Sequence, residues 1–263
     1  MRFLLFQIYA PLVSWGEIAV GGERQSSRHP SKSAIIGLVA AALGIKREEE
    51  ERLNSLSDSI GVAVQLYSGG SVLKDFHTVQ VPRSKSKIVY HTRREELLGL
   101  DEKDNAIISR REYRCDSLSV VAVYLKEEKT EITLEQIEGA LHEPYFHLYF
   151  GRKSCVPSLP LAPIIIDKSN LKEVFDSYRV EFPLPISENN PEWLQDVFLA
   201  YPQKTLFESN VSYFWESGVT TGFKQLQSVE RYDQPLSRRR WQFTSRTEYM
   251  AVERRLEVVD VPQ

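Results

Sequence analysis

The chain has 263 residues, of which 42% are hydrophobic and 26% are charged, and its formal net charge is −3. This is the composition of a globular protein that is long enough to bury a core without disulfides or a structural metal. Its two cysteines, Cys115 and Cys155, lie far apart and form no C-x-x-C pair. The composition therefore excludes a disulfide scaffold and a zinc finger, and it favours the reducing cytoplasm.

The apolar N-terminus is predicted to be a strand and not a secretory signal. Gln7 interrupts the first apolar run, and residues 15–17 offer no small-residue cleavage site. The longest later apolar run, Ala34 to Leu43, is much shorter than the about 18 to 20 residues that cross a bilayer. We expect no membrane segment and a first strand over Phe3–Tyr9.

A well-marked helix follows a polar loop. A serine in Ser31–Ser33 can cap it, apolar residues from Ile35 to Leu43 recur at helical spacing, and Gly44 is placed to end it. The further expected elements are a helix over Glu48–Leu56, a strand over Val62–Tyr67, a strand over Leu118–Leu125, a helix opened by the Thr133–Gln136 capping box and a strand over Phe146–Phe150.

Without residues 68–117, this order predicts an α+β, ferredoxin-like (RRM-like) βαββαβ domain. The omitted segment joins the second and third strands and is too long for a simple turn, so it predicts a functional protrusion. After residue 155, proline-rich loops alternate with strand-like pieces at Ser177–Phe182, Ser212–Trp215 and Gln242–Leu256. We therefore expect a domain over 1–155 and a smaller β-rich C-terminal lobe over 156–263.

The sequence predicts neither a metal nor a cofactor. The histidines are scattered and make no ligand pair, and the Walker, dinucleotide and esterase motifs are absent. Two segments instead suit phosphate. Arg28 and Lys32 flank the N-terminus of the first helix, where the helix dipole favours an anion. The run Gly151–Cys155 places two cations and a hydroxyl after a glycine. An ordinary capped helix and a plain turn with exposed cations are the alternatives.

Aromatic residues lie between these basic segments and are candidates for stacking on unpaired bases. They are Trp15, Phe76, Tyr90, Tyr113, Tyr149 and Trp241. Burial in the core is the usual role of such rings. The run Arg83–Arg94 holds five basic residues and no acid. It lies within the predicted protrusion, where Lys85, Lys87 and Arg93 are expected to contact phosphates.

Several short motifs occur in one order and together resemble the CasD family of subunits of Cascade, the type I-E CRISPR surveillance complex. They are Pro11–Gly16, Arg28–Ser33 with Gly37–Leu38 and Ala42–Ile45, Asp75–Val79, Arg111–Asp116, Tyr149–Cys155 and, more weakly, Arg240–Arg246. The resemblance covers most of the chain except about 184–225, which is expected to be an insertion.

The resemblance implies a RAMP-superfamily protein that caps the 5′ handle of CRISPR RNA, with a thumb hairpin near 80–110 and a glycine-rich loop at 151–155. It implies CasC-like backbone and CasA-like large subunits as partners, and contact with target DNA only through the assembled complex. The expected RNA-binding residues are Trp15, Arg28, Ser31, Lys32, Ser33, His77, Lys85, Lys87, Arg93, Arg111, Tyr113, Gly151, Arg152, Lys153, Ser154 and Cys155.

A metal-independent ribonuclease that processes repeat RNA, as in type I-C systems, is the rival hypothesis. His77 or His29 would then act with Tyr113 and Lys153 as base, acid and cation. In type I-E systems a separate CasE subunit cuts, and no neighbouring Lys-His pair occurs in this sequence, so we expect no catalysis. A scaffold whose basic loops face acidic protein partners is a third hypothesis.

Overall fold

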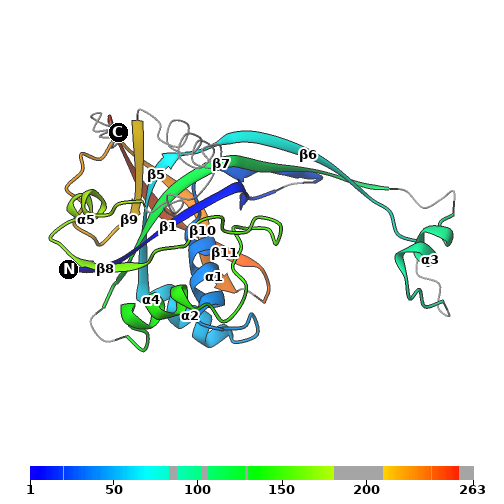
Figure 1. Cartoon of the computed structure of the whole chain (residues 1–263), viewed down its shortest axis with the longest axis horizontal. Helices are drawn as coiled ribbons and strands as arrows, with labels where there is room; N and C mark the ends of the chain where they lie inside the picture. The colour runs from blue at the N-terminus through cyan, green and yellow to red at the C-terminus, as the bar shows by residue number, and fades with distance from the viewer. Residues whose placement is uncertain are drawn as a thin grey trace, which may run out of the picture.

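A computed structural model describes residues 1–19, 21–82, 88–101, 106–127, 130–180, 210–237 and 239–254. Its main feature is a nine-stranded sheet in which seven strands follow the order β10-β11-β9-β5-β7-β1-β8, while β3 and β6 also pair with β7 (Figure 1). The short strands β2 (Trp15–Gly16) and β4 (Ser26–Ser27) pair separately.

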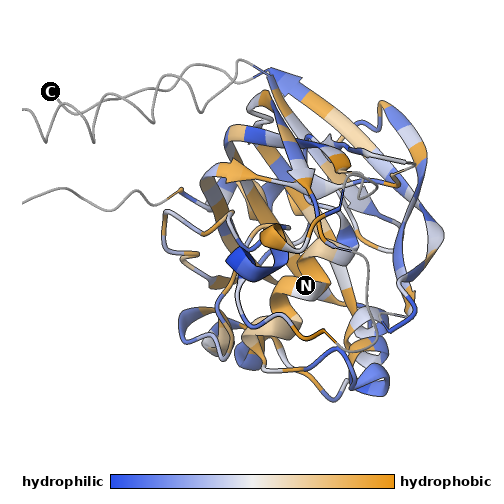
Figure 2. Ribbon diagram, turned by 90° about the vertical axis from the view of Figure 1, so that its right-hand side faces the viewer, coloured by the Kyte–Doolittle hydropathy of each residue, from blue (hydrophilic) through white to orange (hydrophobic). Residues whose placement is uncertain are grey.

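Four antiparallel strands form the centre of the molecule. β1 (Arg2–Val13) lies between β7 (Ile107–Leu125) and β8 (Ile164–Asp167), and β5 (Ile60–Ser68) pairs with the other side of β7. Successive side chains of a strand point to opposite faces. Because both faces of this sheet are covered, β1 and β5 are buried along most of their length, and the strands at the centre of Figure 2 carry much of its hydrophobic colour.

Helices cover the two faces unequally. α1 (Lys32–Ala42), α2 (Glu50–Ser59) and α4 (Leu134–His142) pack on one face, whose core includes Phe6, Ile35 and Val121. α5 (Leu171–Ser177) packs on the other face with Phe3, Tyr124 and Phe175. No helix in the described part of the chain is long and apolar enough to cross a membrane.

The structure confirms most of the expected elements in the first 142 residues. Gly44 ends the first helix with a φ of +74°, and Thr133 and Gln136 form the reciprocal capping box. The strand predicted over Phe146–Phe150 is wrong. The N–H groups of Tyr145 and Phe146 donate to the Ala42 and Ala41 carbonyls at 3.0 and 3.2 Å, so this segment satisfies the end of α1. The strand that pairs with β1 comes later, as β8.

The residues after 155 add strands to both edges of the same sheet. β8 pairs with β1, and β9 (Asn210–Glu216) pairs with β5. Beyond β9 lie β11 (Gln242–Arg254) and the edge strand β10 (Gln227–Ser237). The strands predicted over Ser212–Trp215 and, within the described residues, from Gln242 are confirmed. The boundary predicted at 155 therefore does not separate two sheets.

Two other C-terminal predictions need correction. Ser177, predicted to start a strand, is instead the last residue of α5, a helix that begins after Asn170, whose side chain caps it by accepting from the Glu173 N–H. In the insertion predicted over 184–225, residues 184–209 lie outside the described residues, and residues 210–216 form β9 within the sheet.

The protrusion predicted between the second and third strands is present. β6 (Ser71–Val79) pairs with Ile107–Cys115 of β7, and both strands extend away from the body towards α3 (Arg93–Leu98) (Figure 1). We call residues 71–115 the arm. β3 (Glu23–Arg24) pairs with β7 on its other side.

Shortening the arm tests its independence from the core. Val79 pairs with Ile107, and α3 has no buried residue, so we expect that replacing Pro82–Asp104 by a short Gly-Ser turn changes the melting temperature by no more than about 2 °C. Circular dichroism during heating measures this shift. Loss of a cooperative transition would show that the tip belongs to the folding core.

Candidate nucleic-acid interface

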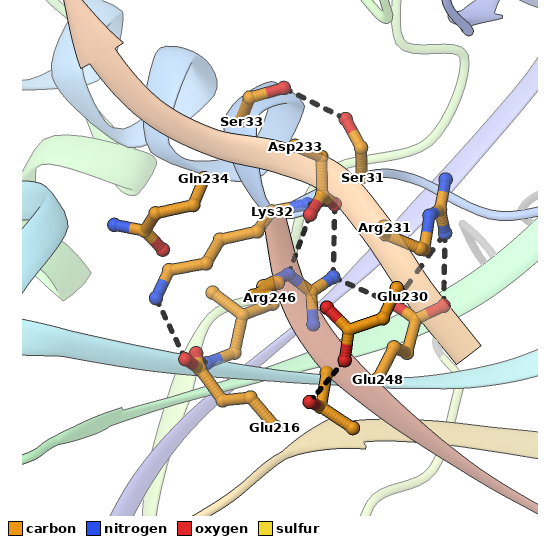
Figure 3. A network of polar contacts seen from close by, with 12 residues as sticks. Ser31, Lys32, Ser33, Glu216, Glu230, Arg231, Asp233, Gln234, Arg246 and Glu248 are labelled. Carbon is orange, nitrogen blue, oxygen red and sulfur yellow. Dashed lines mark hydrogen bonds and ion pairs between the residues drawn. The ribbon is translucent and has the colours of Figure 1, made fainter. Parts of the chain in front are cut away.

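The segment before α1 is fixed to the C-terminal strands by a buried ionic network (Figure 3). The His29 ring stacks on Phe214 with centroids 3.7 Å apart, and its Nε2 lies 3.0 Å from Glu248 Oε1. Arg231 Nη1 lies 3.1 Å from the same carboxylate oxygen, and Arg246 Nη2 lies 2.7 Å from Glu248 Oε2. Glu248 therefore joins the N-terminal loop to strands β10 and β11.

The same network occupies the start of α1. The Lys32 N–H donates to Asp233 Oδ2 at 2.8 Å, and the Lys32 Nζ lies 2.8 Å from Glu216 Oε2 with its side chain fully buried. Ser31 is buried and caps the helix by accepting from the Ala34 N–H, and its hydroxyl lies 3.0 Å from that of Ser33. The chain's own carboxylates thus occupy the place where a phosphate was expected, and the Lys32 side chain is paired inside the protein instead of exposed to RNA.

Burial and charge shift the titration of this network. Burial opposes ionisation of Glu248, but His29 and the two arginines lower its pKa to about 2. Burial lowers the pKa of His29 below its ordinary value. Burial also lowers the pKa of Lys32 to about 8, while the neighbouring Glu216 carboxylate opposes this decrease. These groups pair with one another and join the N-terminal segment to the C-terminal strands.

The glycine loop, Gly151–Cys155, closes on itself beside the end of β1. The Phe150 N–H donates to the Cys155 carbonyl at 2.7 Å, and the Ser14 N–H donates to the Phe150 carbonyl at 3.1 Å. Gly151 has a φ of +89°, and an added Cβ would lie 1.7 Å from the Ser14 carbonyl oxygen. Only glycine fits this close approach.

The loop separates buried residues from exposed ones. Cys155 is buried, which raises the pKa of its thiol, while Lys153 and Ser154 are exposed. Trp15 is 3% exposed and packs 5.8 Å from Phe150. Both side chains therefore belong to the core, which leaves neither the Trp15 ring nor the Cys155 thiol exposed for the RNA contact that was predicted.

Arg152 connects the glycine loop to the arm. Its guanidinium lies over the Tyr113 ring, 4.4 Å from the ring centroid, and donates to the Glu112 carbonyl at 3.1 Å. Tyr113 is 7% exposed, so its ring supports an arginine and is not an open platform for a base. These contacts hold the half-buried Arg152 at the base of the arm.

The register of β6 and β7 places other predicted residues on the face that carries Tyr113. Leu73 pairs with Tyr113, Asp75 with Arg111, and His77 with Ser109, and directly paired residues of antiparallel strands share a face. The His77 ring contacts the Asp75 carboxylate. We call this side of the arm, together with Arg152 and the exposed part of the glycine loop, the arm face.

The remaining predicted residues lie elsewhere. Arg93 is in α3 at the far end of the arm and pairs with Glu96 at 2.7 Å. Arg28 is exposed at the base of the arm, where an added Cβ on Gly69 would lie 2.7 Å from its Nε. Lys85 and Lys87 lie outside the described residues.

Three cations that the sequence analysis did not select lie on the opposite side of the arm. Lys74 lies 3.3 Å from Glu112 Oε1, Arg110 lies 3.3 Å from Glu23, and Arg114 donates to the Ser26 carbonyl at 3.3 Å. The sequence did hold a signal for this placement. Successive residues of a strand point to opposite faces, so Arg110 and Arg114 must lie on the face opposite Arg111 and Tyr113. The contacts of Arg110 and Arg114 attach the arm to residues 23–26, and the contact of Lys74 lies within the arm.

The arm face has the chemistry of a single-strand binding surface. Arg152, Lys153 and Arg111 supply cations for phosphates, and Leu73 and Val79 expose apolar side chains on the same strand. Within the described residues, no three His, Cys, Asp or Glu side chains are grouped to hold a metal ion. The geometry therefore suits binding of an extended polyanion by charge and contact.

Comparison with known proteins identifies the class of this chain. The family profile described as CRISPR-associated protein (Cas_Cas5) matches residues 3–249, so the chain belongs to the Cas5 family of CRISPR-associated proteins. A relative with a known role is the Cascade subunit CasD of Escherichia coli (strain K12). It is 32% identical over 162 residues, which are 60% of this chain and 69% of CasD.

Solved structures share the fold. A chain of a CRISPR RNA-guided surveillance complex aligns with a TM-score of 0.59 and 24% identity, covering 96% of this chain and 89% of the other. A crystal structure of a Cas protein aligns with a TM-score of 0.54 and 24% identity, covering 95% and 94%. The mixed α+β architecture with a large antiparallel sheet is therefore a known one for Cas proteins.

Proposed function

We propose that this chain is a cytoplasmic, non-catalytic subunit of type I-E Cascade that caps the 5′ handle of CRISPR RNA in antiviral defence. The observation that carries the proposal is the arm face, where Arg152 is fixed over Tyr113 at the junction of the glycine loop and the arm. The identity with CasD supports the assignment to Cascade. CasC-like and CasA-like subunits would be its neighbours, and target DNA would be reached only in the complex.

We also propose that four strands form the ferredoxin-like unit. Their order, β8-β1-β7-β5, is all antiparallel. α1 and α2 lie between β1 and β5 in the chain, and α4 lies between β7 and β8. This supports a βαββαβ unit whose second and third strands are extended by the arm, with β9, β10 and β11 added beside it.

Charge reversal at the glycine loop tests RNA binding. We expect the Arg152→Glu, Lys153→Glu variant, co-expressed with the other subunits, to retain about tenfold less guide RNA at moderate salt, because cations neutralise phosphates there. The salt slope of affinity should fall by about 1 to 2. The RNA that co-purifies with the complex measures this loss.

The matched control is Lys168→Glu, Lys224→Glu, which makes the same charge change at exposed lysines outside the arm face. It should retain guide RNA at the wild-type level. Equal retention in the loop variant and the control would contradict the proposed site.

The contacts of the candidate catalytic residues support a binding role. His29 is buried against Phe214 and Glu248, and Arg152 covers Tyr113. His77 is paired with Asp75. We expect purified protein to leave labelled repeat RNA intact in chelator. Site-specific cleavage that His77→Ala or Tyr113→Phe abolishes would instead establish the ribonuclease.

A further inference from the structure

The turn between β10 and β11 holds an exposed aromatic ring that lies outside both the arm and the hydrophobic core. Trp241 is 60% exposed and has a φ of 56°, in the left-handed region that bulky residues rarely adopt. Phe243 contacts it edge-on, with ring centroids 5.5 Å apart. A strained backbone that holds a large ring in solvent is typical of a contact surface.

Arginines surround this ring. The Arg47 guanidinium lies over the indole, 5.2 Å from its centroid. Arg239 and Arg240 line an adjoining pocket of about 330 Å³ together with Ser237 and Glu50. The Arg240 N–H donates to the Ser237 hydroxyl at 3.2 Å, which orders the turn. Among the described residues of this lining, Glu50 is the one carboxylate beside two arginines.

We infer that this turn is a second nucleic-acid contact, in which an unpaired base stacks on Trp241 while Arg239 and Arg240 bind the flanking phosphates of a single strand. An indole stacks on any base, and a guanidinium group can donate two parallel hydrogen bonds to two oxygens of one phosphate. An acidic protein surface would satisfy the arginines but would leave the indole without a planar partner. The site uses the β10–β11 turn and Arg47, so it stands independently of the arm face.

Fluorescence titration of the purified full-length chain with oligothymidylate and oligouridylate tests the inference. The chain has four tryptophans, so the titration uses a Trp193→Phe background, because Trp193 lies outside the described residues. Stacking on Trp241 should then quench indole emission, whereas Trp15 and Trp215 are buried. We expect Trp241→Ala to weaken binding about tenfold, and Trp241→Phe to retain most of the affinity while losing most of the quench. Arg239→Glu, Arg240→Glu should weaken binding at least as much, and Lys168→Glu, Lys224→Glu should leave it unchanged.

The assembled complex distinguishes the source of the strand. Quenching of Trp241 on loading of guide RNA would assign the site to the guide, and quenching only when single-stranded target DNA is added would assign it to the target. Because Trp241 is exposed, its variants should melt within about 2 °C of the wild type. The inference would be overturned if the Trp241 variants and the Arg239→Glu, Arg240→Glu variant showed the same quench and the same affinity as the wild type.

Two further measurements complete the test. Polyglutamate serves as a probe for an acidic protein surface. If Arg239→Glu, Arg240→Glu abolished polyglutamate binding but left oligonucleotide binding unchanged, the surface would be assigned to an acidic protein and the inference would be overturned. A complex that carries Arg152→Glu, Lys153→Glu shows whether the Trp241 quench persists when the arm face is impaired. The outcome at Trp241 is therefore independent of the proposed function.

Discussion

Glu216→Ala is expected to destabilise the protein by about 3 to 5 kcal/mol, because it leaves a buried lysine without its partner. The Glu216 carboxylate accepts from the Val62 N–H at 2.8 Å and lies 2.8 Å from Lys32 Nζ and 3.2 Å from Lys126 Nζ. For a protein of this size, the loss should lower the melting temperature by about 10 °C. Denaturant unfolding with urea measures the free energy directly.

Two further variants test the cause. Glu230→Ala removes an exposed carboxylate that contacts the Thr247 hydroxyl, and it should change the free energy of unfolding by no more than about 0.5 kcal/mol. Lys32→Met combined with Glu216→Leu removes both charges and should be more stable than Glu216→Ala alone. If the double variant were less stable than Glu216→Ala, the unpaired lysine would not explain the loss.

Gly151→Ala is expected to destabilise the glycine loop by about 2 to 4 kcal/mol, because it combines a left-handed backbone with a clash against main chain. The φ is +89°, and the new Cβ would lie 1.7 Å from the Ser14 carbonyl oxygen. Neither atom belongs to a flexible side chain, so the loop must shift. Arg152 should then lose its position over Tyr113, and the complex should retain less guide RNA.

Gly139→Ala is the matched control, because Gly139 lies within α4 and an added Cβ would meet nothing within 4 Å. It should be neutral or stabilise by up to about 1 kcal/mol. Melting temperatures of the two variants, with guide RNA retention in the complex, separate the predictions. A Gly151→Ala protein as stable as Gly139→Ala would show that the loop does not need glycine.

The sequence predicted the elements that depend on local signals. The apolar spacing of α1, its Ser31 cap and the left-handed Gly44 are all encoded within one stretch of 14 residues. The length of the segment after β5 likewise predicted the arm. β8 was missed because Ile164–Asp167 is short, and the richer aromatic run at Phe146–Phe150 bonds to α1 instead.

The site was harder to predict because its decisive contacts join distant residues. A capped helix start beside cations has the same sequence pattern whether its anion is a phosphate or a carboxylate of the same chain. Asp233, which accepts from Lys32, lies 201 residues further along. The glycine loop was identifiable from its own residues, but the position of Arg152 over Tyr113 depends on a fold that joins segments about 40 residues apart.

The most direct test of RNA capping by the arm face is photo-crosslinking in the assembled complex, with 4-thiouridine placed in the 5′ handle and adducts mapped by mass spectrometry. We predict adducts on this chain at the glycine loop and on the face that carries Leu73, His77 and Arg111. They should weaken in the Arg152→Glu, Lys153→Glu variant and persist in the Lys168→Glu, Lys224→Glu control. Handle adducts found only on other subunits, or only on the side of Lys74 and Arg114, would contradict the proposed function.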